Sequence, residues 1–96
     1  MTEFNYYREY WSGHSRDGGM QDGDGFHYLR MSEDGKIHEA IEYYETLDGV
    51  EVVTPMPELV NVNWFKDLGY DSLDILDIVK EADFKRIKGL LTEKSG

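Results

Sequence analysis

Two Asp-Gly dipeptides, Asp34-Gly35 and Asp48-Gly49, divide residues 26–54 into three runs of alternating apolar and polar side chains. Asp-Gly is typical of the two-residue type I′ turn, which needs positive φ angles and matches the twist of paired strands. An alternation with a period of two is typical of strands that bury one face. The sequence therefore predicts a three-stranded antiparallel meander over residues 26–54.

The first turn also predicts a pairing register. A two-residue loop at Asp34-Gly35 predicts the pairs Ser32–Ile37, Arg30–Glu39, Tyr28–Ile41 and Phe26–Tyr43, with His27 opposite Glu42 and His38 opposite Met31 on the second face. The same geometry at Asp48-Gly49 places Leu47 beside Val50 and Glu45 beside Val52. The apolar face then continues through Ile41, Tyr43, Val50 and Val52, and Arg30 and Glu39 form a cross-strand ion pair.

Further elements flank the meander. The aromatic run Phe4–Trp11 favours a fourth strand, at an edge or closing the sheet, with Phe4, Tyr6, Arg8 and Tyr10 on one face. Pro57 and the apolar spacing after it predict a helix over 57–68, although the Val-Asn-Val-Asn run suits a strand equally well. Ser72 or Asp71 is an N-cap candidate for a main helix over 72–92, with a break possible near 80–83 and fraying over 93–96. The fold class expected is α+β: an antiparallel sheet of about four strands with a C-terminal helix on one face.

Residues 12–25 hold five glycines and predict a flexible loop. Asp17, Asp22 and Asp24 invite a calcium reading, but an EF-hand register starting at Asp22 would need an oxygen ligand at Phe26. The three histidines, at positions 14, 27 and 38, lack the spacing of a zinc ligand set. We expect no metal site, no cofactor and no catalytic residue, because no nucleophile–base pair or phosphate-binding loop is present.

Length and composition predict one domain over residues 1–96. The chain has no cysteine, which favours a reducing compartment, and it has no apolar run long enough to cross a bilayer. Its first residues lack the basic and apolar regions of a signal peptide. These features together predict a soluble, cytoplasmic protein.

Charge is unevenly distributed along the chain. Residues 1–77 hold 17 acids against 5 bases, whereas residues 78–96 hold 3 acids against 5 bases. Such an acidic body repels nucleic acid and anionic membranes and is steered toward a basic partner, such as a nuclease or a nucleic-acid-binding protein. An alternative is that the acidity serves solubility only.

The run from Phe65 to Val79 contains Asp71-Ser72-Leu73, preceded by Leu68-Gly69 and followed by Asp74. It resembles the signature of acyl carrier proteins, in which the serine carries a phosphopantetheine arm and opens an acidic helix. The resemblance implies modification at Ser72 and docking on basic enzymes. It covers about residues 65–84, and a β-rich segment stands where the family has a helix. Ordinary helix capping also accounts for an Asp-Ser pair.

The function expected is that of a non-enzymatic acidic interaction protein that inhibits or regulates a basic protein partner. In size and charge it is similar to small toxin-immunity proteins and phage-encoded inhibitors of host defence, which often mimic the charge of nucleic acid. The alternatives are an acyl-carrier-like protein modified at Ser72 and a domain whose acidity serves solubility only. Tyrosines are expected to anchor the complex, because aromatic side chains dominate interface hot spots. The predicted partner-binding residues are Glu39, Glu42, Glu45, Glu51, Asp71, Asp74, Asp77, Tyr7 and Tyr44.

Overall fold

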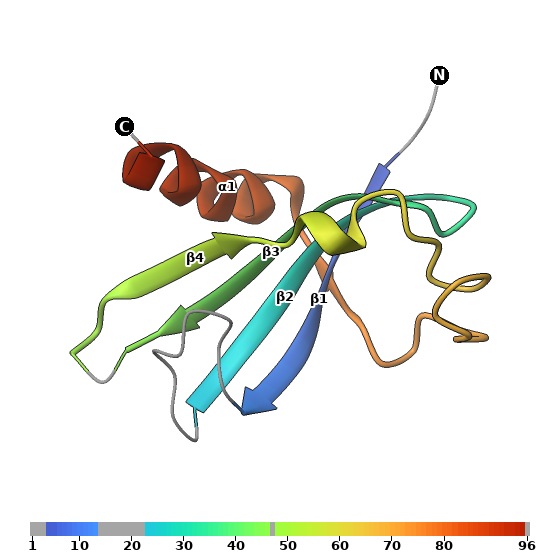
Figure 1. Ribbon diagram of the computed structural model, residues 1–96, viewed down its shortest axis with the longest axis horizontal. Helices are drawn as coiled ribbons and strands as arrows, with labels where there is room; N and C mark the ends of the chain where they lie inside the picture. The colour runs from blue at the N-terminus through green and yellow to red at the C-terminus, as the bar shows by residue number, and fades with distance from the viewer. Residues whose placement is uncertain (1–3, 14–22, 47, 96) are drawn as a thin grey trace.

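The protein has an α+β fold (Figure 1). The structure is a computed structural model, and it describes residues 4–13, 23–46 and 48–95. Its elements are β1 (Phe4–Gly13), β2 (Gly23–Ser32), β3 (Ile37–Glu45), β4 (Glu51–Pro55), the 3₁₀ helix η1 (Pro57–Leu59), β5 (Asp77–Val79) and α1 (Glu81–Ser95). The strands form one antiparallel sheet in the order β4-β3-β2-β1-β5. The predicted fold class is confirmed, with five strands where about four were expected.

The N-terminal strand lies inside the sheet, between β2 and β5. Tyr6 and Arg8 stand opposite Arg30 and Tyr28 of β2, on the face that carries α1. Because β5 pairs along the other side of β1, the expected edge position of this strand is taken by β5 instead. The strands also extend into the predicted 12–25 loop, since β1 ends at Gly13 and β2 begins at Gly23.

The first hairpin reaches its predicted register by an unexpected route. Ser32 N–H donates to Lys36 O at 3.0 Å, which closes a three-residue loop over residues 33–35. Gly35 has a positive φ, whereas Asp34 does not. This geometry is a type I turn followed by a left-handed glycine, not the predicted type I′ turn. A bulge then leaves His38 between the pairs Arg30–Glu39 and Met31–Ile37. The bulge adds back the residue that the longer loop displaced, so Arg30–Glu39, Tyr28–Ile41 and Phe26–Tyr43 are confirmed, whereas Ser32–Ile37 and His38–Met31 are wrong.

The second hairpin lacks such a compensating bulge. Thr46 N–H donates to Val50 O at 2.9 Å, so this loop too has three residues, and Glu45 stands opposite Glu51 rather than Val52. A slip of one residue moves a strand's side chains to the other face. Val53 therefore joins the helix-side core at 4 % exposure, while Val50 is 55 % exposed. The predicted apolar continuation through Val50 and Val52 is wrong.

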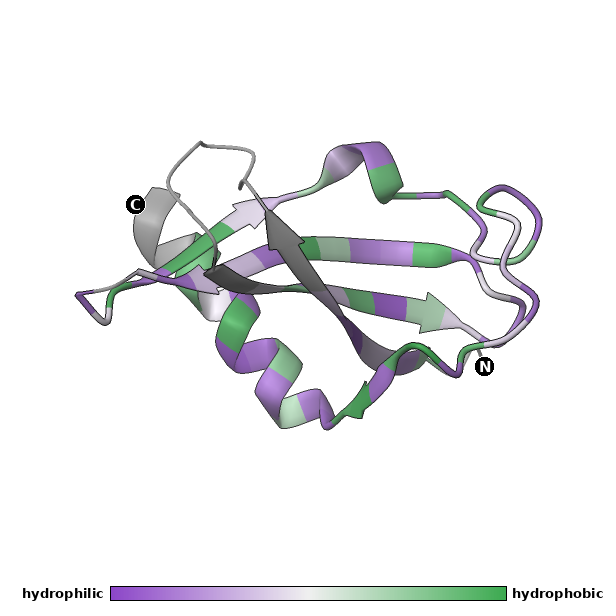
Figure 2. Ribbon diagram, turned by 90° about the horizontal axis from the view of Figure 1, so that it is seen from below, coloured by the Kyte–Doolittle hydropathy of each residue, from purple (hydrophilic) through white to green (hydrophobic). Residues whose placement is uncertain are grey.

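The helix covers one face of the sheet through Phe84 and Ile87, both 1 % exposed. They pack against Tyr28 of β2, Ile41 of β3 and Val53 of the edge strand β4. Figure 2 shows hydrophobic and hydrophilic residues alternating around this helix, as expected for one that buries a single side. Burying side chains of this size contributes about 1.5–3 kcal/mol each relative to exposure.

The other face is covered by irregular chain between η1 and β5. Trp64, 2 % exposed, is its centre, packed with Leu29, Met31, Ile37 and Leu76. The predicted helix over 57–68 is limited to η1, because the chain turns at Asn61, whose φ is 71°, and at Asn63. Asn63 accepts hydrogen bonds from the N–H groups of Phe65 and Lys66, which gives the backbone a non-helical alternative.

The main helix begins at Glu81 and not at Ser72. Residues 77–79 form β5, and Lys80 O accepts the first helical hydrogen bonds from Asp83 N–H at 3.0 Å and Phe84 N–H at 3.1 Å. Glu81 and Asp83 lie in the first turn, where carboxylates interact favourably with the positive end of the helix dipole. The predicted helix over 72–92 is therefore wrong in its first nine residues, and its end lies beyond the predicted one, at Ser95. None of the described helices has the length and apolar character that crossing a bilayer requires.

Candidate functional site

Residues 67–78 form an exposed stretch that we call the acidic segment. It contains Asp67, Asp71, Asp74 and Asp77, all exposed, and no lysine or arginine. Exposed apolar side chains lie between them: Leu68 at 42 %, Tyr70 at 40 %, Ile75 at 56 % and Ile78 at 87 % exposure. Acids alternating with exposed apolar groups are unusual for a surface that serves solubility only, because large apolar side chains work against solubility.

The acidic segment is tied to the core by Trp64 and two leucines. The indole Nε1–H of Trp64 donates to Ser72 O at 2.8 Å, and Tyr70 stacks on the same indole at 4.0 Å between ring centroids. Leu76 is buried, and Leu73 packs partly buried against the same cluster. The segment therefore presents its aspartates from a backbone that the core fixes.

Both ends of the acidic segment are also hydrogen-bonded. At its start, the carboxylate of Asp67 accepts the Asn63 N–H at 2.7 Å, and Asn63 Nδ2–H donates to Asp34 O at 3.0 Å. At its end, Asp77 stands opposite Arg8 in the β1–β5 pairing, and their side chains lie 3.4 Å apart. Asp67 and Asp77 thus serve the fold, which leaves Asp71 and Asp74 as the candidate contacts.

Asp71 and Asp74 lack local counter-charge. Within the described ranges 4–13, 23–46 and 48–95, the ion pairs involve neither of them. Two arginines of the sheet and the helix are matched to other acids, Arg8 to Asp77 and Arg86 to Glu51. The negative potential of the segment is therefore directed outward.

The glutamates of the meander that were predicted to contact a partner lie in different surroundings from one another. Glu39 lies 2.6 Å from Lys88 Nζ and 3.5 Å from Arg30 Nη1, so its charge is offset within the fold. Glu42 is buried at 3 % exposure, near His27. Glu45 is exposed and faces Glu51 across the β3–β4 pair. Their role as partner contacts stays a prediction, and only Glu45 has a geometry that favours it.

Glu51 belongs to a small internal network. It accepts the phenol O–H of Tyr43 at 2.8 Å and pairs with Arg86 Nη1 at 3.1 Å. The Tyr43 hydrogen bond, followed by Arg86, lowers the pKa of Glu51. Burial, followed by the hydrogen bond to Glu51, raises the pKa of Tyr43 to about 12. This network ties α1 to β3 and β4 and accounts for Glu51 without a partner protein.

Neither of the two tyrosines expected to anchor a partner is fully exposed. Tyr44 is buried at 2 % exposure, and Tyr7 packs partly buried against the Trp64 cluster. Tyr70 is the aromatic residue that the acidic segment does expose, and sequence reasoning missed it. Its position between Gly69 and Asp71, within a run of aspartates, is the signal that could have identified it.

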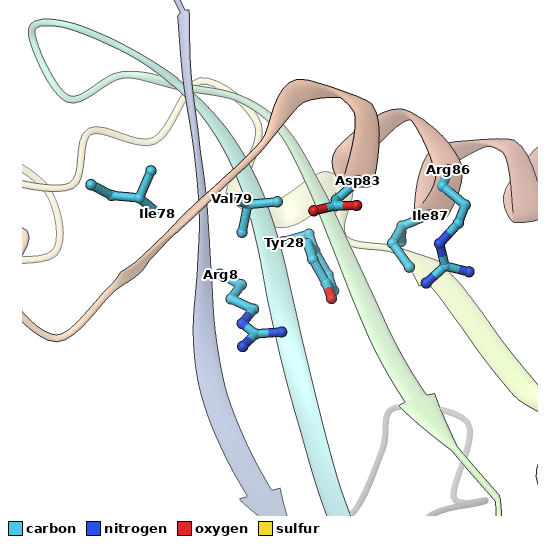
Figure 3. A pocket seen from close by; sticks show the side chains of 7 residues that line it. All are labelled: Arg8, Tyr28, Ile78, Val79, Asp83, Arg86 and Ile87. Atoms are coloured by element: carbon cyan, nitrogen blue, oxygen red, sulfur yellow. The ribbon is translucent and has the colours of Figure 1, made fainter.

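A second candidate is a pocket of about 280 Å³ between β5, β1 and α1, shown in Figure 3. Arg8 and Arg86 reach it from β1 and from α1, and Asp83 also lines it. Arg8 lies over the Phe26 ring at 4.3 Å, and a hydrogen bond to Tyr28 is the largest cause that raises its pKa. Because Asp77 and Glu51 pair with these arginines, the pocket offers no net positive charge for an anion.

The two described histidines, His27 and His38, are not gathered into a metal site. His27 Nδ1 lies 3.4 Å from Glu9 and its Nε2 lies 3.9 Å from Glu42, which confirms the predicted His27–Glu42 pairing. His38 packs edge-on against Phe4 at 4.8 Å. In the part of the chain that the structure describes, no group of three histidine or acidic residues is arranged to hold a metal ion. His14, Asp17 and Asp22 lie outside that part.

Ser72 does not cap a helix. Its hydroxyl accepts the Asp74 N–H at 3.3 Å in a turn, and β5 follows five residues later. The chain therefore lacks the helix that the carrier resemblance implies after the serine. Comparison with models of protein families, with curated proteins and with solved structures finds no match in any of the three. The fold and the site together define a small acidic α+β protein that exposes an acidic and apolar segment at residues 67–78.

Proposed function

We propose that this protein is a non-enzymatic binding protein that docks its acidic segment on a basic protein partner and thereby inhibits or regulates it. The observation that carries the proposal is the pair Asp71 and Asp74, exposed, without an ion-pair partner among the described residues, and held on a backbone fixed by Trp64. A fixed backbone lowers the ordering cost of binding. A nuclease or nucleic-acid-binding protein, as in toxin–immunity pairs, has the basic surface required.

The exposed apolar side chains favour binding over solubility alone. Ile75 is 56 % exposed, and Tyr70 is 40 % exposed although it stacks on Trp64; their positions beside the aspartates match an interface with an apolar centre and a charged rim. Acids of the rim accelerate encounter, while the apolar and aromatic groups retain the complex. Both features occur together in the acidic segment.

The test begins with a pull-down from the native host, followed by binding kinetics with the captured protein at several salt concentrations. We expect a basic partner whose on-rate falls steeply as ionic strength rises. The double variant Asp71→Asn/Asp74→Asn should lower the on-rate more than Glu33→Gln/Asp48→Asn, which removes two charges from exposed turns elsewhere. Tyr70→Ala should chiefly raise the off-rate. Equal effects of the two double variants, or salt-insensitive binding to a neutral or acidic partner, would refute the proposal.

A further inference from the structure

The strand β5 is the last strand of the sheet on the side of β1, and its first two residues end the acidic segment. It pairs with β1 in the register Tyr6–Val79, Tyr7–Ile78 and Arg8–Asp77. Among the described residues, the backbone groups of 77–79 form no hydrogen bond outside this pairing. A strand that is paired on one side only leaves N–H and C=O groups unpaired on its other side. The outer edge of β5 is therefore open to a further strand.

An exposed isoleucine lies on this open edge. Ile78 is 87 % exposed, more than the other large hydrophobic residues that are exposed in the described part of the chain. The next residue, Val79, packs against the helix-side core, and Figure 3 shows Ile78 directed away from it. An isoleucine so exposed adds little to the core, whereas an apolar side chain on a free strand edge favours pairing with another chain.

The opposite edge of the sheet is less suited to pairing. Its strand, β4, ends at Pro55, which has no N–H to donate to a neighbouring strand. The first residue of β4, Glu51, is held by Arg86 of α1. The strand β5 contains no proline, and the exposed Asp71 and Asp74 precede it in the chain. The edge that favours a partner is therefore the one that follows the acidic segment.

Charge decides between a second copy of this chain and a different protein as the occupant of the edge. Each copy carries a net charge of −10, and Asp71 and Asp74 have no ion-pair partner within residues 4–13, 23–46 and 48–95. Two copies joined edge to edge at β5 would bring these aspartates into one interface, where like charges repel. A strand with basic side chains would be attracted instead.

We infer that the open edge of β5 receives an extended segment of the basic partner, which pairs with it as a sixth strand of the sheet. The inference rests on the proposed function and adds to it the manner of docking. Backbone hydrogen bonds to the edge fix the direction of the added strand, and its side chains supply specificity. An apolar residue packs beside Ile78, and a lysine or arginine lies beside Asp77. Because β5 has only three residues, a strand without these side chains gains too little to pair.

The test needs no identified partner. The protein labelled with ¹⁵N is titrated with a capped hexapeptide of alternating lysine and valine. The control is the same peptide methylated on every backbone nitrogen, which keeps the charges and side chains but cannot donate hydrogen bonds. We expect the first peptide to shift the amide signals of residues 77–79 and the methylated peptide to leave them in place. Ile78→Ala should weaken binding about fivefold through loss of its apolar contact. Val50→Ala removes an apolar group that is 55 % exposed beside β4, and it should leave binding unchanged.

The contrary results separate this inference from the proposed function. Equal shifts with both peptides, shifts centred on β4, or equal effects of Ile78→Ala and Val50→Ala would overturn docking on β5. Signals of 77–79 that move with protein concentration alone would identify a second copy as the occupant and would also overturn it. A captured partner whose complex is weakened by Asp71→Asn/Asp74→Asn but unchanged by Ile78→Ala would overturn it too, while leaving the acidic segment as the binding surface. Recovery of only neutral or acidic host proteins, with peptide pairing at β5 retained, would refute the proposed function alone.

Discussion

The indole N–H of Trp64 donates to the carbonyl oxygen of Ser72 at 2.8 Å, and this bond joins the buried centre of one sheet face to the acidic segment. A buried tryptophan normally needs such an acceptor for its N–H. The consequence is that the position of Asp71 and Asp74 depends on a residue that no partner would touch.

Replacing Trp64 with phenylalanine should therefore destabilise the protein and loosen the acidic segment together. The Ser72 carbonyl loses its donor, and we expect a loss of about 1–3 kcal/mol in the free energy of unfolding by denaturant. Amide hydrogen exchange over residues 70–76 should accelerate more than exchange in β2 and β3. Tyr70→Leu, which removes the stacked ring but keeps the indole bond, serves as the control with a smaller cost. Unchanged exchange over 70–76 in Trp64→Phe would contradict this account.

The two turn glycines provide a matched pair. Gly35 has φ 91° and Gly49 has φ 82°, so alanine at either position enters the left-handed region at a cost of about 1–2 kcal/mol. A Cβ at Gly35 would also lie 2.5 Å from the Phe65 ring, whereas nothing lies within 4 Å of one at Gly49. We expect Gly35→Ala to cost about 1–3 kcal/mol more than Gly49→Ala in denaturant unfolding. Equal losses of unfolding free energy in the two variants would mean that the Phe65 ring moves aside without destabilising the protein.

The sheet was largely predictable, because its signals are local. Alternation and Asp-Gly turns specify strands and hairpins by themselves, and the pairs Tyr28–Ile41 and Arg30–Glu39 occur where they were expected. The loop length was not predictable, because a three-residue loop and a two-residue loop both accept Asp-Gly. In the second hairpin, the one additional loop residue shifts the register of β4, so that Val53 and not Val52 enters the helix-side core.

The segment after the sheet was not predictable, because its structure comes from distant contacts. Leu73 and Leu76 have the spacing of a helix face, yet they pack on the side of the sheet opposite Ile87. Ser72 has the residue type of a cap, but the helix begins at Glu81, directly after Lys80, which is not among the residue types preferred at an N-cap. For the site, Asp71 and Asp74 were predicted as partner contacts and lie exposed, although their binding role stays a prediction. The burial of Tyr44, at 2 % exposure, is a tertiary property that the local sequence does not reveal.

The bulge at His38 can be checked in solution. Cross-strand contacts between the Cα protons or amides of Met31 and Ile37, and of Arg30 and Glu39, should both appear in a nuclear Overhauser spectrum. A regular hairpin would give only the second pair and would connect Met31 with His38. Observation of Met31–His38 contacts would contradict the bulged register.

The burial of Tyr43 and its hydrogen bond to Glu51 should make stability depend on pH at both extremes. The pKa of Tyr43 is raised to about 12 in the folded protein, against about 10 in an unfolded chain. Between these values the unfolded chain releases the phenol proton and the folded protein keeps it, so the free energy of unfolding falls as pH rises. The pKa of Glu51 is lowered in the folded protein, so the stability that Glu51 contributes is present above its ordinary pKa and is lost as pH falls through the folded pKa.

Tyr43→Phe removes the phenol. It should flatten the alkaline decline in stability, measured by urea unfolding between about pH 10 and 12, and it should reduce the loss of stability on the acid side. Tyr70→Phe, which removes an exposed phenol, is the control. An alkaline decline identical in the wild type and Tyr43→Phe would show that the fold does not raise the pKa of Tyr43.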